Sequence, residues 1–260
     1  MSNIEGRTGK ISWEVSGGAD SRGLLMIHSL GTDQRMWADQ VPVLSDLRQV
    51  VTFDLPGHGT SRARSGEYSI DDLGNDALAV ADAAGLGEFD LCGISLGGVI
   101  ALWIAVNHPG RLGRLIACNT SSKVGSAELW AQRIDAVEEG GMSGIREAVV
   151  PRFVTADLGD RRPEAMELVW EMFDSVDPVG YIGCCAALRD ADLTASLGDV
   201  DAPTLLIGGT EDVATPPQTM EKLADGIPHG RLHLIEGAAH LSNIDRPGAF
   251  NDVVEQALRA

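Results

Sequence analysis

Short apolar runs alternate with helix-like segments along the first half of the chain. Residues 10–16 (KISWEVS) alternate apolar and polar side chains, which predicts a half-exposed antiparallel strand at the edge of a sheet. Four further runs are compact, apolar and end in loop residues, as parallel strands buried on both faces do. These runs cover residues 24–28, 50–54, 89–93 and 114–119.

The segments between these runs have the period of helices. Residues 70–84 place their apolar side chains on one face, and Asp71 and Asp72 lie in the first turn, where the helix dipole favours acids. Residues 99–107 form a short apolar helix before a Pro-Gly breaker. Late in the chain, strands are expected at residues 204–209 and 231–237, and helices at 218–226 and 247–258.

The middle of the chain has a different pattern. From residue 124 to 195 helical runs follow one another without a convincing strand, at residues 127–139, 142–153, 163–173 and 178–188. The sequence therefore predicts an α/β fold with a mostly parallel, doubly wound sheet. We expect residues 1–121 and 200–260 to form this core, and residues 122–199 to form an all-helical cap.

The charge balance excludes several classes of partner. The chain has 38 acidic and 20 basic residues, a formal net charge of −18. Phosphate backbones and anionic lipid surfaces are bound by clustered basic residues, so we expect no nucleic-acid partner and no membrane docking. No run approaches the 18 apolar residues that would suggest a membrane-spanning helix.

Cysteine usage and the N-terminal residues bear on the compartment. The first 17 residues contain no apolar run of the kind that a secretory signal has. Cys92 and Cys118 sit in apolar strand-like runs, the adjacent Cys184 and Cys185 are poorly placed to bridge each other, and none has zinc-binding spacing. We therefore expect reduced core thiols and a cytoplasmic protein.

The strongest chemical signal is the segment 93–98 (GISLGG), which follows a predicted strand and opens a helix. In this context a G-x-S-x-G pattern predicts a sharp turn that exposes the Ser95 hydroxyl, and the glycines are needed where backbones nearly touch. The Leu96 N–H points toward the same space from the helix N-terminus. The alternative interpretation is an ordinary glycine-rich turn.

A serine nucleophile needs a base and an acid that orients the base. Asp212 follows the strand at 204–209 and His240 follows the strand at 231–237, so both are expected at the carboxyl edge of the sheet with Ser95. Glu211 is the alternative acid. The order Ser, Asp, His along the chain is the order that this architecture requires of a catalytic triad.

The remaining candidates for chemistry are weaker. His28 and His58 lie in loops after strands, and we interpret both as structural, with the Leu30 N–H as a second donor to an oxyanion. The sequence contains no metal-binding histidine or cysteine motif and no glycine-rich phosphate or dinucleotide loop after a strand. We therefore expect chemistry without a metal or another cofactor.

The sequence resembles the α/β-hydrolase family over nearly its whole length, and within that family it resembles the enol-lactone hydrolases. The similar segments are HSLGTDQRMW (28–37), CGISLGG (92–98), CNTSSKVGSAELWAQRI (118–134), CCAALRDADL (184–193), GTEDVATPP (209–217) and AAHLSNIDRP (238–247). The resemblance implies Ser95 as nucleophile, His240 as base and Asp212 as acid. It also implies the Leu30 and Leu96 amides as the oxyanion hole. One departure is Pro56, where these enzymes often have arginine.

The resemblance also implies a small lactone substrate that carries a free carboxylate, so the binding site should contain a cation. Trp130 and Arg133 lie three residues apart on the first cap helix and share a face. Trp130 is equally well explained as cap core, and Arg133 as a surface residue. Lys123 and Arg189 are weaker candidates.

Rival functions remain open from the sequence. A carboxylesterase, a perhydrolase and a C–C bond hydrolase would use the same triad, and a non-catalytic ligand receptor could retain it. Residues 122–199 hold 15 acids and 7 bases, although this is the region expected to cover an anionic substrate. Recognition must then depend on a few donors at short range rather than on the overall field.

Overall fold

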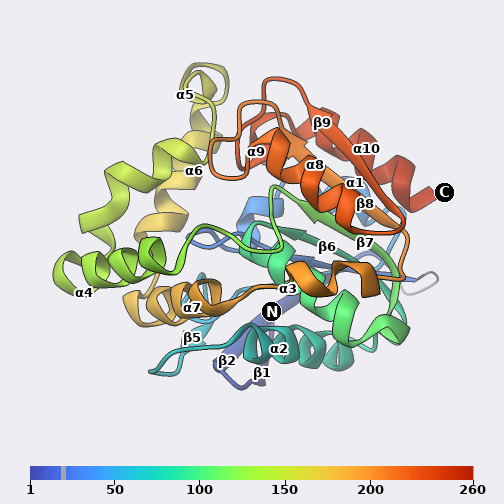
Figure 1. The fold of residues 1–260 in the computed structure, drawn as a ribbon, viewed down its shortest axis with the longest axis horizontal. Helices are drawn as coiled ribbons and strands as arrows, with labels where there is room; N and C mark the ends of the chain where they lie inside the picture. Colours follow the sequence, from blue (N-terminus) through green and yellow to red (C-terminus); the bar gives the residue numbers. More distant parts are fainter. Residues whose placement is uncertain (19–21, 260) are drawn as a thin grey trace.

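One twisted sheet runs through the molecule and helices cover both of its faces (Figure 1). The computed structural model describes residues 1–18 and 22–259. The strands lie in the order β1-β2-β4-β3-β6-β7-β8-β9, and β5 pairs with β2. Their bounds are β1 (Ser2–Glu5), β2 (Gly9–Ser16), β3 (Gly23–Ile27), β4 (Val50–Phe53), β5 (Arg62–Ala63), β6 (Phe89–Ile94), β7 (Leu112–Cys118), β8 (Thr204–Gly209) and β9 (Gly230–Ile235).

The expected α/β class with a mostly parallel sheet is confirmed. All neighbours from β4 to β9 pair in parallel, whereas β1, β2 and β5 pair antiparallel. The prediction that the strand at residues 10–16 lies at the sheet edge is wrong, because β1 pairs along its outer side from Ser2–Trp13 to Glu5–Lys10. Among its four residues β1 has Ile4 as its only apolar side chain, so no hydrophobic pattern marks it.

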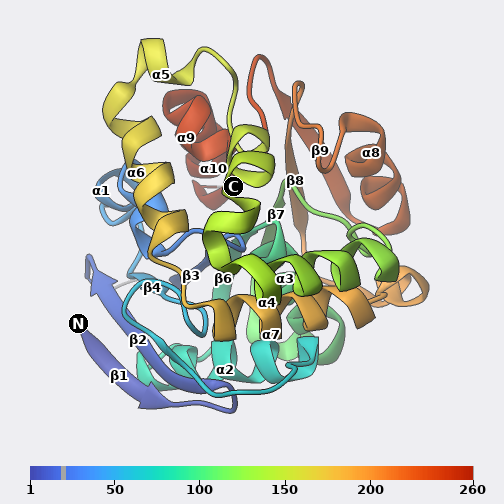
Figure 2. The ribbon, with the colours of Figure 1, turned by 90° about the vertical axis from the view of Figure 1, so that its left-hand side faces the viewer.

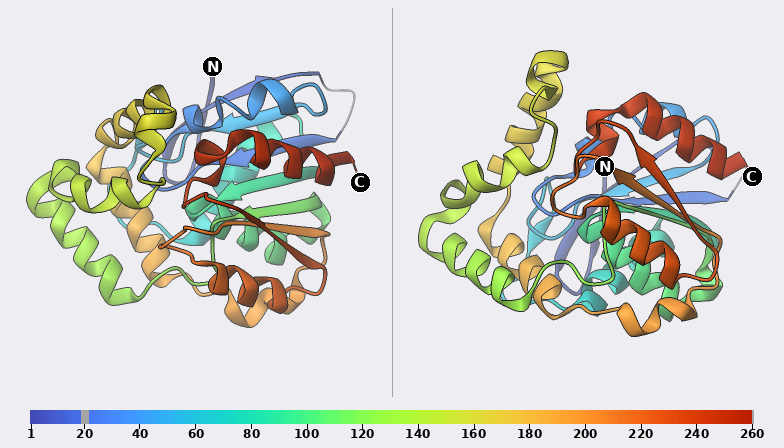
Figure 3. Two further views of the ribbon diagram at one scale, coloured as in Figure 1. Left: turned by 90° about the horizontal axis from the view of Figure 1, so that it is seen from above. Right: turned by 45° about the horizontal axis from the view of Figure 1, so that its top comes forward.

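The helices of the core divide between the two faces of the sheet. In Figure 3 the helices α1 (Val41–Leu44) and α10 (Pro247–Arg259) lie on one face. The helices α2 (Ile70–Ala83), α3 (Leu96–Asn107) and α8 (Pro217–Gly226) lie on the other. A capping box between Ser69 and Asp72 begins α2 where its acidic first turn was expected. The helix α3 begins at Leu96, three residues before the sequence pattern suggested.

Helices alone connect β7 to β8, through residues that are all described, and they cover one end of the sheet (Figure 2). The α-helices are α4 (Ala127–Val149), α5 (Leu158–Arg161), α6 (Pro163–Asp174) and α7 (Pro178–Asp190). Two short 3-10 helices, Val150–Arg152 and Thr194–Asp199, complete the connection. The two runs expected at 127–139 and 142–153 are joined in α4, which bends at Gly141. There φ is 63° and ψ is −168°, a backbone conformation that residues with a side chain rarely adopt.

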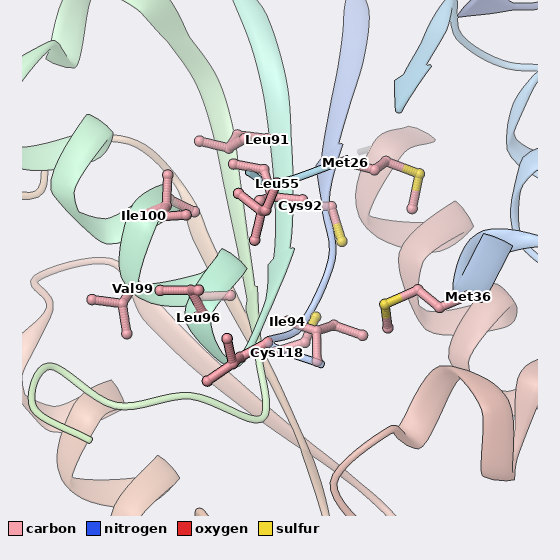
Figure 4. Packing of buried hydrophobic residues seen from close by; sticks show 14 of the residues in the cluster. Met26, Met36, Leu55, Leu91, Cys92, Ile94, Leu96, Val99, Ile100 and Cys118 are labelled. Carbon is pink, nitrogen blue, oxygen red and sulfur yellow. The ribbon is translucent and has the colours of Figure 1, made fainter. Parts of the chain in front are cut away.

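The elbow between β6 and α3 lies in the most apolar part of the core. Every residue of β6 is buried, and so is every residue of α3 from Leu96 to Ala105. Figure 4 shows Leu96, Val99 and Ile100 of α3 packed beside β6. A helix that is apolar on all sides has to be enclosed, so this packing fixes the position of the turn before it.

The four cysteines are free and buried, as the sequence predicted. Burial raises the pKa of Cys118 and Cys184, and raises that of Cys185 to about 12, so these thiols remain protonated and unreactive. Among the described residues no helix is both long and apolar enough to cross a membrane.

Candidate active site

Ser95 occupies a strained turn between β6 and α3. Its φ of 56° and ψ of −115° are unusual for a residue with a side chain. A Cβ added to Gly93 would lie 2.2 Å from the carbonyl oxygen of Gly97, and one added to Gly97 would lie 2.2 Å from that of Ile27. The glycines are therefore required by close backbone approach, as the sequence predicted, and an ordinary glycine-rich turn does not explain this geometry.

Asp212 and His240 lie together, although 28 residues separate them. Asp212 Oδ2 is 2.9 Å from His240 Nδ1, and both side chains are buried. Ser95 and His240 line the same cavity. Glu211, the alternative acid, is exposed to solvent. The loop after β8 thus presents Asp212, and not Glu211, to the histidine.

The Asp212 carboxylate is held by donors on both oxygens. Oδ1 accepts the backbone N–H groups of Ala214 (2.8 Å) and Thr215 (3.0 Å), and Oδ2 accepts the Thr215 hydroxyl (2.6 Å) and the Asn119 amide (3.0 Å). Burial by itself would raise the pKa of Asp212. The charge and hydrogen bond of His240 and the Thr215 donors outweigh burial and lower that pKa well below its ordinary value. This acid is therefore ionised and fixed in direction.

Asn119 was not identified from the sequence. It directly follows β7, is fully buried and has a φ of 45°. Its side-chain amide donates to Asp212 and to the carbonyl of Ala239 (3.2 Å), and its oxygen accepts the Ser242 hydroxyl (2.6 Å). Asn119 therefore ties the acid to the loop that carries His240. These contacts join distant parts of the chain, so no local motif marks them.

The loop with Leu30 is held by two buried histidines. His28 accepts the Leu55 N–H on Nε2 (2.8 Å), and His58 accepts the Gly31 N–H on Nε2 (3.1 Å). Burial lowers the pKa of His28 to about 4 and that of His58 to about 3, so both rings are neutral at pH 7. Each histidine thus bonds the backbone of the loop that carries the other, which agrees with the structural role expected for both residues.

Leu30 itself lines the cavity, and Leu96 is the first residue of α3. Backbone N–H groups in the first turn of a helix have no acceptor within the helix and point toward its N-terminal end. The two backbone amides expected to form an oxyanion hole therefore belong to the segments that flank Ser95.

A cavity of about 120 Å³ lies between the core and the cap helices. Its core wall includes Ser29, Leu30, Ser95, Ala214 and His240. Its cap wall includes Trp130, Arg133, Arg152, Phe153 and Tyr181. The space is well below the roughly 300–1,000 Å³ of sites for drug-sized ligands, which favours a small ligand.

The structure places both predicted binding residues at this cavity. The Trp130 indole N–H donates to the carbonyl of Val124 (2.6 Å), so its polar atom is occupied and its ring serves as wall. Arg133 is half-buried and donates to the Tyr181 hydroxyl (3.2 Å). Tyr181 was not identified from the sequence, because it lies among the apolar residues of α7 and belongs to no motif.

The basic residues between positions 122 and 199 divide into two groups. Five of the seven form ion pairs with described acids: Lys123–Asp192, Arg146–Asp174, Arg161–Asp157, Arg162–Asp39 and Arg189–Glu67. The other two, Arg133 and Arg152, have no ion pair with any residue that the structure describes, and both line the cavity. Lys123 and Arg189, the weaker candidates, are thus neutralised elsewhere. Arg152 carries no motif and was missed.

Among residues 1–18 and 22–259, no group of three or more His, Cys, Asp or Glu side chains could hold a metal ion. The polar side chains at the cavity are the hydroxyls of Ser29, Ser95 and Tyr181, an imidazole paired to a carboxylate, the Trp130 indole and two guanidinium groups. This combination is suited to nucleophilic acyl transfer on an anionic molecule.

Comparison with known proteins agrees with this chemistry. A model of the alpha/beta hydrolase family matches residues 24–253. The chain is 34% identical to 3-oxoadipate enol-lactonase 2 of Acinetobacter baylyi, over 96% of this chain and 93% of that protein. It is 30% identical to a putative carbamate hydrolase, RutD, of Agrobacterium fabrum, over 95% and 97% of the two chains. The crystal structure of an enol-lactonase from Burkholderia xenovorans superposes over the whole of both chains, with a TM-score of 0.96 and 33% identity.

Proposed function

The chain belongs to the alpha/beta hydrolase family, and we propose that it hydrolyses 3-oxoadipate enol-lactone to 3-oxoadipate through a Ser95-His240-Asp212 triad. This is a step of the β-ketoadipate pathway of aromatic-compound degradation. The observation that carries the proposal is the pair Arg133 and Arg152. In a protein with a net charge of −18, these two cap cations lack an acidic partner among the described residues and face the cavity of Ser95. A substrate carboxylate supplies that partner.

In the proposed acylation step, Ser95 Oγ attacks the lactone carbonyl carbon while His240 Nε2 takes the hydroxyl proton. Asp212, ionised and bonded to Nδ1, stabilises the imidazolium that forms. The Leu30 and Leu96 N–H groups stabilise the oxyanion, each contributing on the order of 3 kcal/mol to lowering the barrier.

Collapse of the tetrahedral intermediate breaks the acyl–oxygen bond of the ring. The leaving oxygen is an enol, which is a better leaving group than an ordinary alkoxide, and it takes the proton from His240. The enol tautomerises to the ketone. A water molecule then attacks the Ser95 ester while His240 takes its proton. The second tetrahedral intermediate collapses, the carboxylic acid is released, and His240 returns the proton to Ser95 Oγ.

The second candidate is a hydrolase of another small acyl substrate with the same triad. The similarity to a putative carbamate hydrolase favours an ester or carbamate substrate over unrelated chemistry. The core wall of the cavity serves either substrate, because only the acyl carbon meets Ser95. The cap cations distinguish the two, since a neutral ester gains nothing from them.

The test compares freshly generated enol-lactone with neutral p-nitrophenyl esters on the purified protein. We expect the larger kcat/KM with the lactone, and a loss of about 10⁴-fold or more in Ser95→Ala with an unchanged unfolding temperature. A preference for neutral esters would identify a carboxylesterase. Stoichiometric turnover without recycling would identify a ligand receptor.

A further inference from the structure

A buried carboxylate links the loop of His240 to the cap. Asp245 closes the short helix α9 (Ser242–Asp245) and is 1% exposed. Its oxygens accept the N–H of Thr155 (3.1 Å to each oxygen), the Thr155 hydroxyl (2.7 Å) and the N–H of Ala239 (2.8 Å). Arg161 Nη2 lies 3.5 Å away and supplies the countercharge. One side chain thus fixes both a cap segment and the residue before His240.

The same cap segment also holds the residue after His240. The Leu241 N–H donates to the carbonyl of Phe153 (2.7 Å). The Phe153 ring lies against the His240 imidazole, with 6.3 Å between the ring centres and 27° between their planes. We call residues 153–155 the cap strap. It contacts His240 itself and, directly or through Asp245, both of its chain neighbours.

Since the direction of a side chain follows its backbone, these contacts set where the imidazole points. We propose that Asp245 is a positioning residue for His240, which it holds in place by seating the cap strap on the loop of the base. This inference rests on the proposed role of His240 as the base. Arg152 directly precedes the strap and lines the cavity, so substrate contact and base position meet within four consecutive residues.

The alternative role for Asp245 is stability alone, and the chain contains a matched example of that role. Asp76 on α2 is 2% exposed and accepts the N–H of Arg7, the N–H of Thr8 and the Thr8 hydroxyl. It anchors the turn between β1 and β2, no residue of which lines the cavity. Asp76 and Asp245 therefore each bind two backbone N–H groups and one threonine hydroxyl, Asp76 far from the site and Asp245 beside it, and Asp245 has Arg161 in addition.

The experiment compares Thr155→Val with Thr8→Val, each of which removes one hydroxyl donor from a buried carboxylate. Both should lower the unfolding temperature. Thr155→Val should also lower kcat for a p-nitrophenyl ester by about 10-fold or more with little change in KM, because small misplacements of a reacting group are costly. Thr8→Val should leave kcat unchanged, and Thr155→Ser, which keeps the hydroxyl, should restore it.

A second measurement makes the result independent of the natural substrate. The rate of Ser95 labelling by a fluorophosphonate reports how well His240 activates the hydroxyl, and it should fall in Thr155→Val and in Asp245→Asn. If Asp245→Asn fails to fold, Thr155→Val alone decides the question, because it retains the carboxylate. Thr155→Val that labels and turns over at the wild-type rate would overturn the role of Asp245. A wild type that labels at Ser95 but does not open the lactone rejects the substrate instead.

Discussion

The two walls of the cavity differ in how their polar groups are satisfied. Behind the core wall, buried polar groups are fully bonded: Asp212 is surrounded by donors, and His28 and His58 accept N–H groups of the loops next to Leu30. On the cap wall, Arg133 has one neutral partner and Arg152 has none among the described residues. The groups behind the core wall are thus fixed in position without a ligand, whereas the two cap arginines still have donors available for a ligand. In the proposed function the core provides the reacting groups and the cap provides the substrate contacts, while the cap strap also positions His240.

The sharpest test of the core wall is Asp212→Asn. The amide keeps the shape of the carboxylate but loses its charge, and its NH₂ group faces donors rather than acceptors. We expect kcat to fall by about 10⁴-fold for every substrate, because the imidazolium is no longer stabilised. Steady-state kinetics with a p-nitrophenyl ester check this, with the exposed Glu211→Gln as control. A loss below tenfold would mean that Asp212 is not the acid.

Acid should lower the free energy of unfolding because His28 and His58 are buried as neutral rings. Their pKa values, about 4 and about 3, are depressed below the 6.5 of the unfolded chain, so unfolding takes up protons as the pH falls. Their neutral form stabilises the fold fully above pH 6.5. This stability is lost toward pH 4, at up to about 1.4 kcal/mol per pH unit for each ring. Urea unfolding between pH 7 and 4 measures the slope.

The matched variant for this measurement is His58→Gln, which can still accept from Gly31 and does not titrate. Its unfolding free energy should depend less steeply on pH than that of the wild type. Equal slopes in the two proteins would show that His58 is not the source of acid sensitivity.

On the cap wall, Arg133→Ala should affect anionic substrates alone. A charged hydrogen bond of about 1.5–3 kcal/mol corresponds to a rise in KM of roughly 10- to 100-fold for the enol-lactone. KM for a neutral p-nitrophenyl ester should stay within about twofold. The same rise for both substrates would indicate that Arg133 shapes the cap rather than binding a carboxylate.

The smallest effect is expected from Arg152, because its side chain is exposed and exposed charges contribute little. Arg152→Ala should raise KM for the lactone by about two- to fivefold in low salt, and by less as salt is added. In the wild type, salt should lower this KM because it screens the repulsion from the net charge of −18. A KM that rises with salt would show that local attraction dominates.

Much of the core wall could be predicted from the sequence because each of its groups follows a buried strand. Ser95, Asp212 and His240 come after β6, β8 and β9, and the carboxyl ends of parallel strands meet at one edge. Asn119 and Asp245 were not predicted, since their partners are distant in the chain. Short elements such as β1 and α9 are also missing from the prediction, because four residues show no period.

The cap wall was harder to predict for a different reason. The helices were visible from their period, but which arginine faces the cavity depends on how each helix is rotated and on which acids lie nearby. Arg133 and Arg189 have similar surroundings in sequence, yet Arg189 pairs with Glu67 of the core. Arg152 follows a proline in a short turn, where no periodicity assigns a face.

The bend at Gly141 separates two groups of cap residues that have different proposed roles. It splits α4 into an arm that carries Trp130 and Arg133 and an arm that leads to Arg152 and the strap on His240. If Arg133 binds the substrate and the strap positions His240, as proposed, substitutions in the first arm should change which substrates bind without moving the base. We therefore expect variants confined to residues 127–140 to differ in substrate preference while the geometry of Ser95, His240 and Asp212 is retained.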